Sequence, residues 1–260
     1  MKLDASHAVT ALLILLLLGL CAGHGTALVR SDDAWMHLAI GRMIVERGEL
    51  PERDVFLNSG EPAEWTIHSW LSEVVFYGVM QTGALTLLMA FRALLVAVTL
   101  GVLLVLLRRL GAPTWLAVLL GCVVLLVPGI RSTLLRPLLF SHLLLVVFLL
   151  VIYQVRAKRW GPRVLWALPA VMVLWANLHA GHIVGAALAL LLPAAMVLDR
   201  LLKRPAQLSW RAAGAPAAAC VLATLLNPYG PRIWAYALGF AGDGAYQGQV
   251  WEWVAASPAR

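Results

Sequence analysis

The chain has 260 residues, of which 62% are hydrophobic and only 13% are charged. A soluble domain carries about twice that share of charged side chains, so this composition excludes an ordinary soluble protein. The net charge of +7 would suit nucleic acid, but most basic residues lie in short loops between apolar runs, where they set membrane topology. We therefore expect a lipid bilayer, and no nucleic acid, as a partner.

Several apolar runs approach or exceed the roughly 18–20 residues that a helix needs to cross a bilayer. The chain is therefore predicted to be all-α, a polytopic transmembrane helix bundle that forms one module over residues 1–260. A signal-peptide core is the alternative for the first run, but its length favours an uncleaved span. The predicted spans, about seven, are residues 8–29, 84–107, 113–130, 137–155, 164–178, 183–198 and 212–226.

Basic residues mark alternate loops of this arrangement. Lys2 precedes the first predicted span, and Lys and Arg follow the second, fourth and sixth. By the positive-inside rule these loops are cytoplasmic, so the protein is expected in the cytoplasmic (inner) membrane with a cytoplasmic N-terminus. The long first loop, residues 30–83 with interfacial helices, one of them at 70–81, and the tail at 227–260 then face outward. The basic loop residues are Arg108, Arg109, Arg156, Lys158, Arg159, Arg163, Arg200, Lys203, Arg204 and Arg211.

The outward ends of the predicted spans carry most of the other unusual polar residues. Arg131 and Arg136 lie between the third and fourth spans, Asn177 and His179 between the fifth and sixth, and Tyr229 after the seventh. Polar groups at membrane depth are costly, so their convergence indicates one shared aqueous site. The alternative is that loop ends are polar in any membrane protein.

Asp32 and Asp33 open the most polar stretch of the chain, residues 32–70. His37 follows Asp33 by four residues, so on a helix the two side chains share a face. A carboxylate there could act as a general base toward an acceptor hydroxyl, or hold a divalent cation. The alternative is that the two aspartates cap the helix, for which one of them suffices.

Arg131 and Arg136 are candidates for binding an anionic headgroup, because a planar guanidinium grips phosphate through paired hydrogen bonds and keeps its charge. Snorkelling of interfacial arginines explains them equally well. His179 and His182 have no carboxylate nearby in the sequence, so hydrogen bonding is favoured over metal binding for both. No set of metal ligands is predicted.

At these residues the chain resembles the GT-C superfamily of integral-membrane glycosyltransferases, which use polyprenyl-phosphate-linked sugars. Residues 33–38 (DAWMHL) are similar to the acidic motif that opens the first outer loop of oligosaccharyltransferase catalytic subunits. Three later segments resemble bacterial members of the superfamily: residues 136–141, 175–179 and 227–230. The same loop also resembles the first outer loop of protein O-mannosyltransferases and lipid A aminoarabinose transferases. The matching residues are Asp32, Asp33, Arg42, Met43, Gly48 and Pro51.

The resemblance implies a seven-helix module with an acidic residue in the first outer loop that serves catalysis or holds a metal, with Asp33 the first choice and Asp32 the second. No cofactor is expected, and a divalent cation is the alternative. Relatives usually carry further spans or a soluble outer domain, so the tail at 227–260 is interpreted as shortened. The second acidic metal ligand of the oligosaccharyltransferases has no convincing counterpart, although Asp54 and Glu64 are candidates. This departure favours a mechanism without a metal.

The expected function is transfer of a sugar from a polyprenyl-phosphate donor to an acceptor at the outer surface. Asp33 would deprotonate the acceptor hydroxyl, and Asp32 and His37 are the further catalytic candidates. The residues assigned to substrate binding are Arg131, Arg136, Trp35, Trp65, His68, Asn177, His179 and Tyr229.

Two other functions remain open at this stage. A truncated or degenerate relative would bind a lipid-linked glycan or a partner without turnover, and the short length of the chain favours it. A transporter or flippase would show internal repeats and ionisable residues near the membrane midplane. The sequence shows no clear repeat, and Arg92 is the single candidate for such an ionisable residue.

Overall fold

The structure, a computed structural model, describes residues 5–26, 32–56, 64–126, 134–205 and 208–242. The regular structure of this part of the chain is helical, and an isolated antiparallel bridge joins Arg53 to Glu64. The predicted all-α class is therefore confirmed. Three of the described helices are long and apolar enough to cross a membrane: α3 (Trp70–Arg109), α5 (Leu138–Arg156) and α7 (His182–Leu201).

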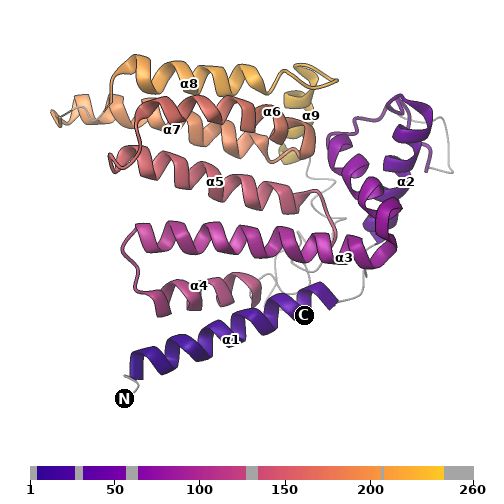
Figure 1. Cartoon of the computed structure of the whole chain (residues 1–260). Coiled ribbons are helices and arrows are strands. Elements are labelled where there is room, and N and C mark those ends of the chain that lie inside the picture. The colour runs from indigo at the N-terminus through magenta and orange to yellow at the C-terminus, as the bar shows by residue number, and fades with distance from the viewer. Residues whose placement is uncertain (1–4, 27–31, 57–63, 127–133, 206–207, 243–260) are drawn as a thin grey trace, which may run out of the picture.

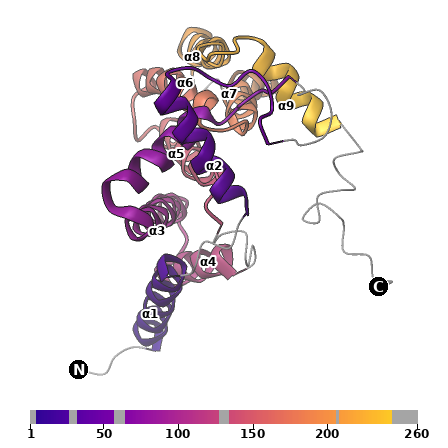
Figure 2. The ribbon, with the colours of Figure 1, turned by 90° about the vertical axis from the view of Figure 1, so that its right-hand side faces the viewer.

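The long helices lie side by side with shorter apolar helices, and α2 (Asp32–Arg47) and α9 (Arg232–Gly242) lie at one end of them (Figures 1 and 2). We call this end the α2 end. The opposite end, which we call the turn end, carries the turns that follow α3, α5 and α7 (Figure 1). The shorter helices of the stack are α1 (Ala5–Thr26), α4 (Thr114–Leu126), α6 (Leu168–Leu178) and α8 (Trp210–Ala223).

Helix α3 combines the interfacial helix predicted at 70–81 with the span predicted at 84–107. The two parts meet at a kink, where Gly83 (φ −157°, ψ 23°) and Ala84 (φ 56°, ψ −165°) leave the helical conformation. Ala84 lies in a backbone region that residues other than glycine rarely adopt. The kink in α3 therefore lies where the sequence predicted the boundary between the segment at 70–81 and the apolar span at 84–107.

One predicted span begins differently in the structure. The span predicted at 164–178 begins as a 3-10 helix, η2 (Pro162–Ala167), and only α6 continues as α-helix. Proline lacks the N–H that an α-helical ladder requires, and it fits best in the first turn of a helix. Pro169 lies in the first turn of α6. The predicted ends of the first and third spans, at 29 and 130, lie outside the described residues.

Within the tail predicted at 227–260, residues Arg232–Gly242 form helix α9, which was not predicted from the sequence. The chain turns after α8 through Gly230, whose φ is +52°. Ile233 is then buried, and Trp234 packs against the main core. An eleven-residue helix is marginal by itself, so this packing rather than local propensity accounts for α9.

Helix α2 packs closely on the first half of α3. Ile40 and Ile44 of α2 form a small buried cluster with Ile67, and Gly41 lies directly against the α3 backbone. A Cβ at Gly41 would come within 2.6 Å of the carbonyl carbon of Glu73 and within 2.9 Å of the Cβ of Tyr77. Because such contacts do not occur between real atoms, any side chain at this position must push the two helices apart.

We therefore expect Gly41→Ala to lower the free energy of unfolding by about 1–3 kcal/mol, the usual cost of overpacking. The measurement is the thermal unfolding midpoint of the detergent-purified protein. Gly78→Ala is the matched control, because Gly78 is also helical but has no atom within 4 Å of an added Cβ. That variant should be neutral or slightly stabilising, since alanine favours helix over glycine. Equal midpoints for the two variants would contradict the close α2–α3 contact.

Candidate functional site

Polar side chains from distant parts of the sequence meet at the α2 end. They come from α2, the segment 64–73 that leads into α3, the first turn of α5, the α6–α7 junction and the segment 224–236. Hydrogen bonds and ring contacts link them into connected groups. Of the residues predicted to converge, Arg136, Asn177, His179 and Tyr229 make contacts at this end; the shared aqueous site stays a prediction.

The most buried carboxyl group of this site belongs to Glu73, in the first turn of α3. Its side chain is 2% exposed, and Oε1 accepts a hydrogen bond from Ser69 Oγ (2.9 Å). A second hydrogen bond joins Oε1 to Nδ1 of His37 on α2 (3.2 Å). Oε2 is buried and has no hydrogen-bond partner among the described residues. Such a carboxyl group at the end of an apolar bundle points to a functional site.

Asp33 forms an ion pair with Arg136, which precedes α5. The Asp33 side chain is 42% exposed and that of Arg136 is 30% exposed, so both remain open to a ligand. The pair joins two segments that lie about a hundred positions apart in the sequence. One candidate catalytic carboxylate and one candidate phosphate-binding cation are thereby brought into contact.

His179, at the α6–α7 junction, is held in one tautomer. Gly181 N–H donates to His179 Nδ1 (2.9 Å), and because an N–H can only donate, Nδ1 carries the lone pair and Nε2 the proton. Trp175 Nε1–H donates to Ser141 Oγ (2.7 Å), which leaves the Ser141 hydroxyl hydrogen to donate to the same Nδ1 (2.8 Å). The surrounding protein therefore presents His179 as a neutral ring with an Nε2–H donor.

His68 and His179 lie together and are both uncharged at neutral pH. Burial, with the neighbouring His68 as a further cause, lowers the pKa of His179 to about 3. Burial and the nearby His37 lower the pKa of His68 to about 4. The His68 ring stacks on Tyr236 with centroids 4.7 Å apart, and its centroid is 5.9 Å from that of His179. Around His68 and His179 the site thus offers neutral N–H donors and aromatic faces, and its positive charge comes from Arg136.

Asn177 and Tyr229 connect the segments of the site. Asn177 Oδ1 accepts from Trp70 Nε1–H (2.8 Å), and its Nδ2 donates to the carbonyl oxygens of Val173 (2.7 Å) and Leu226 (2.9 Å). Both amide hydrogens of Asn177 are therefore used within the protein. Tyr229 Oη accepts from the Ile67 N–H (2.9 Å), so the tyrosine's own hydroxyl hydrogen stays available for donation.

The remaining candidates from the sequence lie apart from these contacts or outside the described residues. Trp35 is on α2 and is 51% exposed. Trp65 is half-buried and makes an edge contact with Phe56. Arg131 lies outside the described residues, and so does the side chain of Asp32, although Asp32 begins α2.

Glu73 and Ser141 were missed as site residues by reasoning from the sequence. Glu73 is the only acidic residue of α3, which is the signal that could have marked it. Ser141 carried no comparable signal, because a serine in an apolar helix commonly bonds a neighbouring carbonyl oxygen. Within the described residues, no group of three His, Cys, Asp or Glu side chains is arranged as metal ligands.

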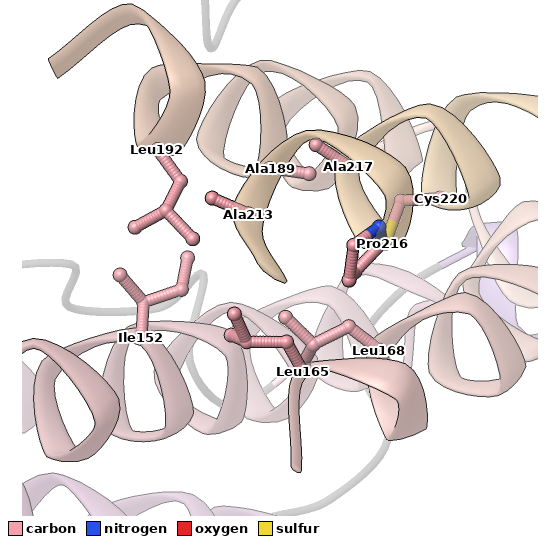
Figure 3. A pocket seen from close by; sticks show the side chains of 9 residues that line it. All are labelled: Ile152, Leu165, Leu168, Ala189, Leu192, Ala213, Pro216, Ala217 and Cys220. Atoms are coloured by element: carbon pink, nitrogen blue, oxygen red, sulfur yellow. The ribbon is translucent and has the colours of Figure 1, made fainter. Parts of the chain in front are cut away.

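A small hollow elsewhere in the bundle is not a competing site. It lies between α5, η2, the start of α6, α7 and α8 and is lined mostly by hydrocarbon side chains such as Ile152, Leu168 and Ala217 (Figure 3). Its volume of about 10 Å³ is at most that of one water molecule, and water in such a place needs polar partners. We interpret it as a packing defect of the apolar core.

Comparison of the chain with family models, with curated proteins and with solved structures finds no match. The chemistry of the α2 end therefore has to be argued from its own residues.

The lowered pKa values of His68 and His179 predict a loss of stability in acid. Both folded-state pKa values lie below the ordinary 6.5, so the unfolded chain binds more protons between pH 6.5 and about 4. Stability should fall as the pH is lowered through that window, and these two groups should contribute no change above it. The measurement is the thermal unfolding midpoint in detergent as a function of pH.

His68→Phe is the informative variant, because phenylalanine keeps a ring against Tyr236 but does not titrate. We expect its midpoint to fall less than that of the wild type between pH 6.5 and 4. Carboxyl groups that protonate in the same range affect both proteins and cancel in the comparison. Parallel pH profiles for the two proteins would show that His68 is not buried in its neutral form.

Proposed function

We propose that the chain is a membrane glycosyltransferase of the GT-C type, which transfers a sugar from a polyprenyl-phosphate-linked donor to an acceptor on the extracytoplasmic side. The observation that carries the proposal is the contact between Asp33 and Arg136, both partly exposed at the end of an apolar helix bundle. A base for the acceptor and a cation for the leaving phosphate are the two charged groups that this reaction needs.

In the proposed reaction, Asp33 accepts the proton of the acceptor hydroxyl. The acceptor oxygen attacks the anomeric carbon of the sugar as the bond from that carbon to the donor phosphate oxygen breaks, so the anomeric configuration inverts. The leaving phosphate keeps the bonding electron pair, and Arg136 stabilises its negative charge through charge-assisted hydrogen bonds. Arg136 must release Asp33 at least in part when the donor binds, which leaves the carboxylate free to act as base.

The neutral groups of the site suit sugar recognition. His179 offers an Nε2–H donor and Tyr229 a hydroxyl hydrogen, and neither adds charge at neutral pH. The stacked rings of His68 and Tyr236 provide an apolar face of the kind on which pyranose C–H groups pack. Donors and aromatic faces in a partly buried site give orientation and specificity.

The hydrogen bond between His37 and Glu73 has a positioning role in this proposal. His37 lies one helical turn from Asp33 on α2, and Glu73 belongs to α3. Together with the close approach at Gly41, this bond fixes the rotation of α2 about its axis. The rotation decides whether the Asp33 carboxylate reaches Arg136.

The proposal includes a topology of about seven spans in the cytoplasmic membrane, with the N-terminus in the cytoplasm. The three long helices are complemented by shorter apolar stretches at 8–23, 114–126 and 162–178, together with α8. The turn end carries the basic loops and would be cytoplasmic, whereas the α2 end would face outward. A lipid-linked donor could then reach Arg136 from the outer leaflet.

Single substitutions of the ion pair test the proposed roles. We expect Asp33→Asn to lower the rate of sugar transfer at least about a hundredfold, because it removes the base but keeps the shape. Arg136→Ala should lower the rate to a similar degree by removing the stabilising cation. The assay is transfer from a panel of polyprenyl-phosphate hexoses and pentoses in proteoliposomes, with native mass spectrometry of the bound lipid.

A charge swap separates catalysis from structure. Asp33→Arg combined with Arg136→Asp restores an ion pair between the two positions, so thermal stability should recover while transfer stays lost. Arg42→Gln combined with Glu46→Gln removes an exposed ion pair of α2 (2.8 Å) and serves as the control that keeps activity. Transfer by the swapped protein at the wild-type rate would overturn the proposed roles and leave the pair a structural one.

Cysteine accessibility tests the proposed orientation. The three native cysteines are free, and each lies within an apolar helix. We expect Glu49→Cys, which follows α2, to react with a membrane-impermeant maleimide in intact cells. Lys203→Cys, which follows α7, should react only after the membrane is opened. The reverse pattern would place the α2 end in the cytoplasm and contradict an extracytoplasmic reaction.

A further inference from the structure

The turn end contains a larger hollow that is unrelated to the site at the α2 end. It lies between the turn that follows α5 and the start of α8, and its volume is about 420 Å³. Volumes of this order are typical of small-ligand sites. Its lining combines the apolar side chains of Val155, Leu208 and Ala212 with those of Lys158, Arg159 and Trp160.

The basic side chains at this hollow are well placed for an anion. Arg159 is held in position because its Nη1 donates to the Arg109 carbonyl oxygen (3.0 Å) and its guanidinium lies over the Tyr153 ring (5.8 Å). Lys158 is exposed and lies beside it in the sequence. A planar guanidinium held in place and an exposed ammonium group at the same hollow suit a phosphate group.

The surroundings of the hollow are strongly basic. Asp199 is the single acidic residue in the turns that follow α3, α5 and α7 and in the helix ends beside these turns. Their field therefore attracts anions and repels cations. The basic residues of these turns and helix ends that do not line the hollow are Arg108, Arg109, Arg156, Arg163, Arg200, Lys203, Arg204 and Arg211.

The position of the hollow favours a lipid over a soluble anion. It opens where the apolar helices end, and Trp160 (39% exposed), Trp166 (55%) and Trp210 (48%) lie at the same end. Exposed tryptophans are typical of the depth at which lipid headgroups lie. Leu201 and Leu202 are exposed nearby, at 74% and 51%, and offer apolar surface to acyl chains.

We propose that this hollow binds the headgroup phosphate of an anionic phospholipid. Lys158 and Arg159 contact the phosphate, Trp160 covers the glycerol, and the apolar side chains of the lining contact the first methylenes of the acyl chains. The proposal does not depend on sugar transfer at the α2 end. A basic pocket between helix ends is a known arrangement for such lipids.

The chain offers a matched pair of lysines for the test. Lys158 and Lys203 each follow the end of a helix in the left-handed conformation, with φ of 56° and 54°. Both are exposed, but only Lys158 lines the hollow. Asparagine tolerates the left-handed conformation, so Lys158→Asn and Lys203→Asn should fold alike and lose the same charge at the same end of the molecule.

The experiment is native mass spectrometry of the full chain, released from nanodiscs that contain equal amounts of phosphatidylglycerol and phosphatidylcholine. We expect the wild type to retain phosphatidylglycerol selectively and Lys158→Asn to retain it about fivefold more weakly, the usual effect of one basic residue near a membrane surface. Lys203→Asn should match the wild type. Equal losses of phosphatidylglycerol retention in the two variants would overturn the proposed binding site in favour of a diffuse basic surface. Unchanged retention in Lys158→Asn would also overturn it.

A second variant removes space instead of charge. Ala212→Leu places a larger side chain in the hollow and leaves every basic residue in place, so retention of phosphatidylglycerol should fall as it does in Lys158→Asn. Unchanged retention in this variant would show that the hollow does not hold the lipid. Soluble glycerol 3-phosphate serves as the competitor, and displacement of the lipid at equimolar concentration would identify the site as one for free phosphate esters.

Discussion

The contact between α2 and α3 is the constraint on which the α2 end depends. Gly41 allows the two backbones to approach, and the hydrogen bond between His37 and Glu73 fixes the rotation of α2. Asp33 lies one turn away on the same helix, so its contact with Arg136 follows from that rotation. A side chain at Gly41 would therefore disturb a charged pair located two helical turns away.

The cost of burying polar groups explains how the rest of the molecule is organised. Helices that cross hydrocarbon satisfy their own backbone and leave polar side chains to the ends. At the α2 end several of these side chains are bonded to one another, as Trp175, Ser141 and His179 are, and the charged pair Asp33 and Arg136 is in contact. At the turn end they are mostly cationic and exposed. The two ends therefore differ in chemistry: the α2 end combines one partly exposed ion pair with neutral donors and aromatic rings, and the turn end is basic.

Much of the helical framework follows from apolar run length and from proline and glycine. The kink at Gly83 and Ala84 coincides with the predicted boundary, and α5 begins one residue after the predicted start at 137. The start of α6 was misjudged because hydropathy does not register the missing N–H of proline. Helix α9 was missed because an isolated eleven-residue helix is marginal, and only contacts between distant segments stabilise it.

The sequence by itself determined that this is an apolar helical protein with a polar first loop and basic turns, because composition and run length act locally. It also identified Asp33, Arg136, His68 and His179 as unusual for their surroundings. The tertiary structure alone decided that Asp33 meets Arg136, that Glu73 lies behind His37, and that Asn177 uses its amide hydrogens within the protein. These contacts join segments far apart in the chain, and their geometry depends on how helices rotate and pack, which no local pattern of residues encodes.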